Sequence, residues 1–175
     1  LPLVLCALLA VAGQTSWENV GYLVVALAML DVFVAVLGLH CGMIYASSRS
    51  AILASLGTLF FLLVGVATCI AVLLAFSGPS SRAFEVQLAP FLAFMVGGSA
   101  GLYFALGAKS PSAAIGWAAL VCPFATFWAI TSYFLDYTLG IFLVTLATYG
   151  FATLTMLIPA VAEFDAIIGR TTGNE

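Results

Sequence analysis

Five apolar stretches, each long enough to cross a lipid bilayer, constrain this chain more than any other feature of its sequence. A helix of about 20 apolar residues spans the roughly 30 Å of hydrocarbon in a bilayer. Inside hydrocarbon the backbone must satisfy its own hydrogen bonds, which a helix does within each segment. We therefore predict an all-α, polytopic transmembrane helix bundle with five full spans, at residues 20–45, 51–76, 87–107, 113–134 and 138–163.

The composition excludes several other classes of protein. Charged residues make up only 6% of the chain and hydrophobic residues 65%, whereas soluble domains carry about 25% charged residues. The four lysines and arginines among 175 residues, with a formal net charge of −3, are too few for the basic face that binds nucleic acid. We expect the lipid bilayer to be the main partner and no nucleic acid to bind.

The N-terminal stretch LPLVLCALLAVAG is apolar but shorter than a span, and it lacks the basic region of a signal peptide. We interpret it as an N-terminal partial helix, the second part of a helix that begins upstream, so that the chain is a fragment of a longer protein. Residues 1–170 are expected to form a single transmembrane domain. Residues 171–175 are expected to be a disordered cytoplasmic tail.

The short polar segments between the spans predict antiparallel neighbours. Counting alternate connections places Arg49, Lys109 and Arg170 on one side of the membrane and Arg82 on the other. Lysine and arginine in short loops are retained on the cytoplasmic side. We therefore predict an integral protein of the cell (inner) membrane whose C-terminus is cytoplasmic.

Asp31 lies near the middle of the first full span, in the stretch LVVALAMLDVFVAVLG. Insertion scales assign a charged group at this depth a cost of about 2.5–3.5 kcal/mol, so the carboxylate should not face lipid. Small residues recur on the same helical face, and they let another helix approach closely: Ala28, Ala35, Gly38 and Gly42. We expect Asp31 to point into a contact between helices.

The second span offers a matching face of small and polar residues at helical spacing: Ala51, Ala54, Ser55, Thr58, Gly65, Thr68 and Cys69. A rise of about 1.5 Å per residue puts Asp31 level with Thr68 of this span and with Tyr149 of the last span. Their hydroxyls are candidate hydrogen-bond partners. Two interpretations stay open: a substrate or proton site, or a carboxyl group that locks helices together.

The remaining polar residues do not form a recognisable metal or redox site. The cysteines are scattered singly inside apolar stretches, at Cys6, Cys41, Cys69 and Cys122, without the close pairs that zinc sites and redox motifs use. His40, the only histidine, is nine residues from Asp31 and so on the opposite face of its helix. We expect no metal, no cofactor and a structural role for this histidine.

The stretch GGSAG at residues 97–101 matches the GxSxG pattern of serine hydrolases. A nucleophile elbow needs a strand-to-helix turn, which a membrane helix does not provide. We interpret these small residues as a GxxxG-like face for close helix packing, so that no catalytic residue is expected; an intramembrane hydrolase using Ser99 is the alternative. Pro123 and Pro159 lie inside helical runs and predict kinks.

One longer stretch, LGLHCGMIYASSRSAILASLGTLFFLLVG at residues 37–65, resembles a signature of ABC-2-type transporter permeases. The matching positions lie around the expected turn between two spans: Gly38, Leu39, Ser47, Ser48, Arg49, Ser50 and Ala51. The closing stretch EFDAIIGR is also similar to the cytoplasmic end of some members of that family.

The resemblance implies a six-helix permease half that pairs with a second half, as a homo- or heterodimer, and is driven by a cytoplasmic ATPase subunit or domain. It also implies that Ser48, Arg49 and Ser50 form a cytoplasmic coupling turn near that ATPase. The chain contains no GxxxxGK[ST] loop, so any ATP is handled elsewhere and we expect no enzyme here. Two alternatives remain: a proton-coupled secondary transporter centred on Asp31, and a non-transporting membrane assembly subunit.

Overall fold

The helices account for nearly all of the chain whose structure can be described. The computed structural model describes residues 11, 16–68, 70–71, 81–107, 113–133 and 138–171, with the side chains of 81–88, 132–133 and 163–171 left out of that description. Its elements are α2 (Trp17–Ile44), α3 (Ser48–Leu59), the π-helical segment η1 (Phe60–Gly65), α5 (Ser81–Gly107), α6 (Ala113–Tyr133) and α7 (Thr138–Thr171). The described ranges contain no strand, and the predicted all-α class is confirmed.

Five helical segments are long and apolar enough to cross a membrane: Trp17–Ile44, Ser48–Thr68, Ala89–Gly107, Ala113–Thr131 and Thr138–Ala162. They coincide with the five predicted spans to within a few residues at most ends. The chain is an integral membrane protein. Except for Val11, the predicted N-terminal partial helix lies outside the described residues, and so do residues 172–175 of the predicted tail, whereas Thr171 is the last residue of α7.

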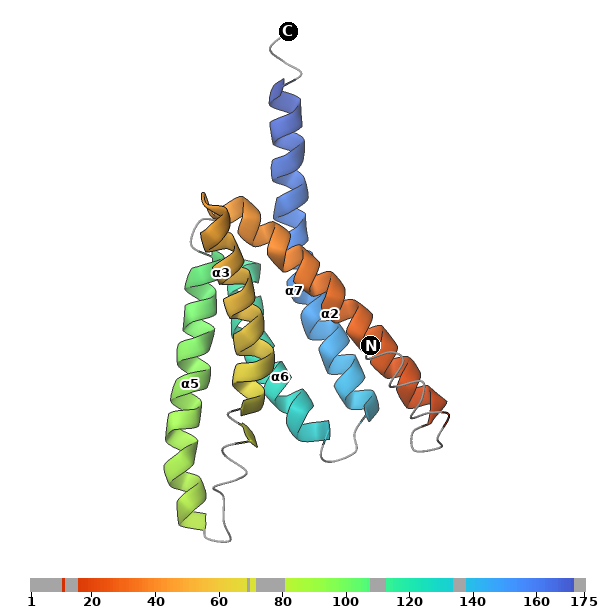
Figure 1. Cartoon of the computed structure of the whole chain (residues 1–175), viewed down its shortest axis with the longest axis vertical. Helices are drawn as coiled ribbons and strands as arrows, with labels where there is room; N and C mark the ends of the chain where they lie inside the picture. The colour runs from red at the N-terminus through yellow and green to blue at the C-terminus, as the bar shows by residue number, and fades with distance from the viewer. Residues whose placement is uncertain are drawn as a thin grey trace.

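Figure 1 shows how these helices are arranged. The α3 helix stands beside α5, with α6 packed against α5 and α7, while α2 crosses the bundle at an angle and lies along α7. The α2–α3 turn, the C-terminal end of α5 and the C-terminal end of α7 all lie at one end of the bundle (Figure 1). The last part of α7 continues past that end as a free-standing helix.

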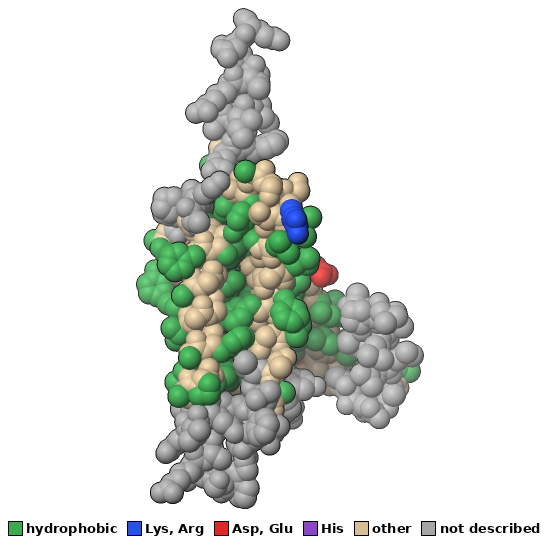
Figure 2. All heavy atoms as spheres, turned by 60° about the vertical axis from the view of Figure 1, so that its left-hand side comes forward, with side chains coloured by type: hydrophobic (Ala, Val, Ile, Leu, Met, Phe, Trp, Pro, Cys, Tyr) green, Lys and Arg blue, Asp and Glu red, His purple; other side chains and the backbone are tan. Residues whose placement is uncertain are grey.

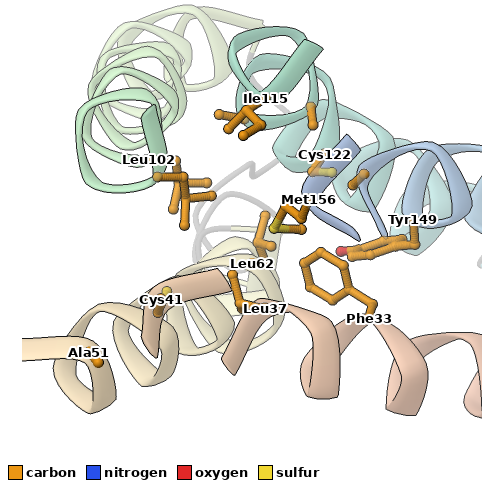
Figure 3. Packing of buried hydrophobic residues seen from close by; sticks show 14 residues of the cluster. Phe33, Leu37, Cys41, Ala51, Leu62, Leu102, Ile115, Cys122, Tyr149 and Met156 are labelled. Carbon is orange, nitrogen blue, oxygen red and sulfur yellow. The ribbon is translucent and has the colours of Figure 1, made fainter. Parts of the chain in front are cut away.

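The buried core draws on every helix. Phe33 and Leu37 of α2 point toward Leu62 of η1 and toward Tyr149 and Met156 of α7 (Figure 3). The α5 and α6 helices close the other side, with these buried residues: Leu102, Leu106, Ile115, Ala118, Ala119 and Cys122. Apolar side chains also cover much of the outer surface (Figure 2), as expected where the solvent is lipid rather than water.

A π-helical segment interrupts the second span at Phe60–Gly65. There the Val66 N–H donates to the Phe61 carbonyl, five residues back instead of four. The ring of Phe61 lies against Gly98 of α5, where a Cβ would overlap it. Within the GGSAG stretch, Gly98 is therefore the residue that packs closely, because its missing side chain leaves room for the Phe61 ring.

Of the small residues predicted to form a GxxxG-like face, at positions 97, 98, 100 and 101, Gly98 packs closely, whereas the prediction is wrong for Gly97 and Gly101 within the described part of the chain. A Cβ added at either glycine would meet no described atom within 4 Å. Both glycines are exposed, because α5 turns Gly98 and Ser99 inward instead.

Candidate functional site

The α2–α3 turn holds the three residues predicted to form the coupling turn, Ser48, Arg49 and Ser50, and all three are exposed. Ser47 is in an extended conformation and caps α3: its hydroxyl oxygen accepts from the backbone N–H of Ser50 at 3.2 Å. The Ser47 hydroxyl in turn donates to the Ser50 hydroxyl at 2.8 Å. Such a cap stabilises a helix by about 1 kcal/mol, so the start of α3 is well defined.

Arg49 occupies an unusual position for a cation. It lies in the first turn of α3, where the unpaired backbone N–H groups make the helix end electropositive. The structure shows no ion pair between Arg49 and any side chain that it describes. A cation beside the positive end of a helix favours an anionic partner, and phosphate or carboxylate groups suit this position.

Two side chains of the α2 end hold the turn against α5. The buried His40 ring donates from Nε2 to the Leu106 carbonyl at 3.1 Å, and the Tyr45 hydroxyl donates to the Ala105 carbonyl at 2.9 Å. The last four carbonyls of a helix have no partner within it, so these bonds satisfy groups that α5 leaves free. We call this pair of hydrogen bonds the α2–α5 clasp.

Sequence reasoning assigned His40 only a structural role and missed the clasp. A histidine and a tyrosine five residues apart at the end of an apolar run were the available signal. This spacing does not identify the acceptors, because every residue has a backbone carbonyl and the sequence does not show which one lies nearby in the fold.

A cavity of about 380 Å³ opens beside the turn. It is lined by Gly38, Gly42, Tyr45, Ala46, Ser48, Ala51, Ile52 and Ser55. Serine hydroxyls and glycine backbone make it more polar than the helix surfaces around it. The turn is therefore a protruding loop with a recess at its base, which suits contact with another macromolecule.

Asp31 does not face the other described helices, so the expectation that it points into a contact between helices is wrong for this part of the chain. Its side chain is exposed, whereas α2 buries Phe33 and Leu37, which lie on the opposite side of the helix. Four small residues share the exposed face with it: Ala28, Ala35, Gly38 and Gly42. We call these five residues the Asp31 strip.

Thr68 is also exposed, so it is not the predicted partner of Asp31. In a regular α-helix Thr58, Gly65 and Thr68 would share a face, as the sequence spacing suggests. The π-helical segment adds a residue to one turn; Leu62 within it and Val66 and Ile70 after it are the buried positions. This extra residue rotates Thr68 out of the bundle.

Tyr149 lies in the core and bonds to α6 instead of to Asp31. Its hydroxyl lies 2.7 Å from Oγ1 of Thr126, which itself donates to the Cys122 carbonyl at 2.8 Å, so Tyr149 is the donor of the first bond. The ring meets Phe33 edge to face, with centroids 4.9 Å apart. Tyr149 thus joins α2, α6 and α7, and Thr126 is a partner that the sequence did not indicate.

Ser99 lies in the middle of α5, not on a strand-to-helix turn, and its buried hydroxyl has no hydrogen-bond partner among the described residues. It lines a groove of about 440 Å³ between α5 and α6, beside Tyr103, Gly116 and Trp117. His40 bonds to Leu106, which is about 10 Å along α5 from the serine. The arrangement does not pair a serine nucleophile with its base.

No group of three or more histidine, cysteine, aspartate or glutamate side chains is placed to hold a metal among the residues described. Cys41 and Cys122 are buried and free; Cys6 and Cys69 lie outside the description. Comparison with family models, with curated proteins and with solved structures finds no match.

Proposed function

We propose that this chain is the membrane-spanning permease component of an ATP-driven transporter of the ABC type, and that the α2–α3 turn receives the motion of the ATPase. The observation that carries the proposal is the α2–α5 clasp behind an exposed turn. Arg49 is exposed and can meet an anionic partner, while His40 and Tyr45 bond the base of the turn to α5.

The two hydrogen bonds of the α2–α5 clasp allow the turn to transmit force to α5. A force on Arg49 acts on the ends of α2 and α3, and the bonds from His40 and Tyr45 pass it to the end of α5. Three spans then move together, which a loop without such bonds would not achieve. The end of α7 lies on the same side of the bundle (Figure 1), so a partner there meets both elements.

The alternatives find less support in the geometry. A proton-coupled carrier centred on Asp31 needs that carboxylate to line a pathway, whereas it faces away from the described helices. Such a carrier would require a second bundle packed on α2. A non-transporting assembly subunit fits the exposed Asp31 strip but leaves the clasped turn without a role.

The test uses the full-length parent protein, purified from its native membrane in mild detergent. We expect a stoichiometric ATPase subunit or a fused ATPase domain and measurable ATP hydrolysis. A photo-crosslinking amino acid at position 49 should attach to that ATPase, and nucleotide should change the yield of the adduct. A protein without ATP hydrolysis or a nucleotide-binding partner would refute the proposal.

Charge reversal at the turn tests the relay itself. We expect Arg49→Glu to lower transport-linked ATP hydrolysis by about tenfold, a typical size for coupling between sites, while Arg49→Lys retains most of it. Arg82→Glu, in the first turn of α5 at the opposite end of the bundle, is the matched control and should have little effect. Equal activity of Arg49→Glu and wild type would rule out a relay through this turn.

A further inference from the structure

The depth of Asp31 makes its exposure significant. It lies near the middle of α2, about 20 Å along the helix from either end, and therefore in the hydrocarbon rather than among the headgroups. Ionisable groups at this depth almost always face a bundle interior or a partner. The exposed side of α2 is therefore a surface that another element is expected to cover.

The described helices leave this surface open. Only 11% of the most apolar window of α2 is buried, against 22% to 33% in the other four spans. Asp31 and the buried Phe33 are two residues apart, which places them about 200° apart around the helix. Asp31 has no hydrogen bond or ion pair with any side chain placed by the structure.

The Asp31 strip has the shape of a helix-packing face. A Cβ added at Gly38 or Gly42 would meet no described atom within 4 Å. Small residues on either side of a polar group let the backbones of two membrane helices approach, and this brings a polar side chain of the partner within reach. The strip thus combines a surface that allows close approach with one exposed carboxyl group at mid-membrane depth.

The chain itself does not supply the matching charge. Its four basic residues lie at or beyond the ends of the spans: Arg49, Arg82, Lys109 and Arg170. A second copy of these 175 residues therefore places no cation at the depth of Asp31, and two copies packed symmetrically on this face would bring two carboxylates together.

We propose that the Asp31 strip binds a transmembrane helix from outside these 175 residues that carries a lysine or arginine near its middle. The ion pair, or the hydrogen bond that remains if the proton is shared, satisfies the carboxylate, and the glycines set the distance between the two helices. This inference does not depend on ATP-driven transport, and its test contains no nucleotide.

The experiment places the purified chain, with a fluorescent donor attached at its C-terminal end, in phosphatidylcholine vesicles. The probes are acceptor-labelled leucine-based transmembrane peptides of about 20 residues, with either lysine or leucine at the centre. Energy transfer measures association. We expect the lysine peptide to associate about tenfold more strongly than the leucine peptide.

Substitutions locate the binding face. Asp31→Asn should remove the preference for lysine while keeping the size of the side chain. Gly38→Leu should weaken association with the lysine peptide by blocking close approach, whereas Gly101→Leu, at an equally open glycine on α5, should not. Circular dichroism and gel filtration of each variant establish that it folds like the wild type.

Four results would overturn the proposal. The two peptides could associate equally, or Asp31→Asn could leave the preference for lysine unchanged. The chain could also associate with itself in a way that requires Asp31 and that the lysine peptide does not disrupt. That result would identify a second copy as the occupant of the strip. Binding that appears only after residues 1–16 are removed would show that this segment covers the strip.

Discussion

Removing the Tyr45 hydroxyl tests the α2–α5 clasp with the smallest possible change. Tyr45→Phe keeps the ring, which packs against the core, and deletes only the donor that lies 2.9 Å from the Ala105 carbonyl. The carbonyl belongs to the last turn of α5 and has no partner within that helix. The substitution therefore leaves an acceptor unsatisfied at the junction of three helices.

The expected cost follows from the depth of the bond. Hydrogen bonds between membrane helices contribute about 0.6 kcal/mol on average and about 1.7 kcal/mol at most. Tyr45 is only partly buried, so water reaches the end of α5 and partly replaces the lost donor. We expect Tyr45→Phe to lower the free energy of unfolding by about 0.5–1 kcal/mol.

His40 is the stronger half of the clasp. Its ring is only 2% exposed and donates to the Leu106 carbonyl, so His40→Ala removes both a buried hydrogen bond and ring volume. We expect a loss of about 2–4 kcal/mol. Because the two bonds hold the same helix end, the double variant should lose less than the sum of the two single losses.

The assay is reversible unfolding in mixed micelles with increasing sodium dodecyl sulfate, followed by the fluorescence of the tryptophans. Tyr103→Phe is the matched control, because Tyr103 is exposed and its hydroxyl makes no hydrogen bond within the described chain. Equal effects of Tyr45→Phe and Tyr103→Phe would refute the clasp as a source of stability. Additive losses for Tyr45 and His40 would refute their acting on one helix end.

Two other contacts give simpler predictions. Tyr149→Phe should lower the free energy of unfolding by about 0.6–1.7 kcal/mol because it deletes a buried bond to α6; a change too small to measure would contradict that bond. Gly98→Ala should destabilise the protein by about 1–3 kcal/mol because the new methyl group overlaps the Phe61 ring. Phe61→Leu should restore most of that loss, and Gly97→Ala, at an open position, should be neutral; a destabilised Gly97→Ala would show that the open face of α5 is occupied.

The positions of the spans could be predicted because the bilayer restricts them so strongly. Twenty or so apolar residues in a row have few other structures available, and each predicted span coincides with a helix. The rotation of each helix about its axis is a different problem. In a membrane both faces of a helix are apolar, so the hydrophobic pattern says little about which side is buried.

Asp31 and Thr68 illustrate this limit. A carboxylate avoids lipid, so the sequence pointed it toward the other spans, whereas α2 packs through Phe33 and Leu37 on its opposite side. Thr68 was placed by counting regular α-helical turns, and the π-helical segment at Phe60–Gly65 changes that count. Nothing in the residue types of FFLLVG marks such a segment.

The length of α7 gives small motions inside the membrane a large effect outside it. Thr138–Thr171 runs for 34 residues, or about 50 Å, which exceeds the hydrocarbon thickness by about 20 Å. The outer turns continue a helix already formed in the membrane and so avoid the cost of separate nucleation. If the helix behaves as a rigid lever, a change of about 10° in its tilt displaces its far end by about 9 Å. Pro159 lies near the point where α7 leaves the bilayer. The stiffness of the helix turn at this proline therefore determines how much of the change in tilt reaches the C-terminal end of α7.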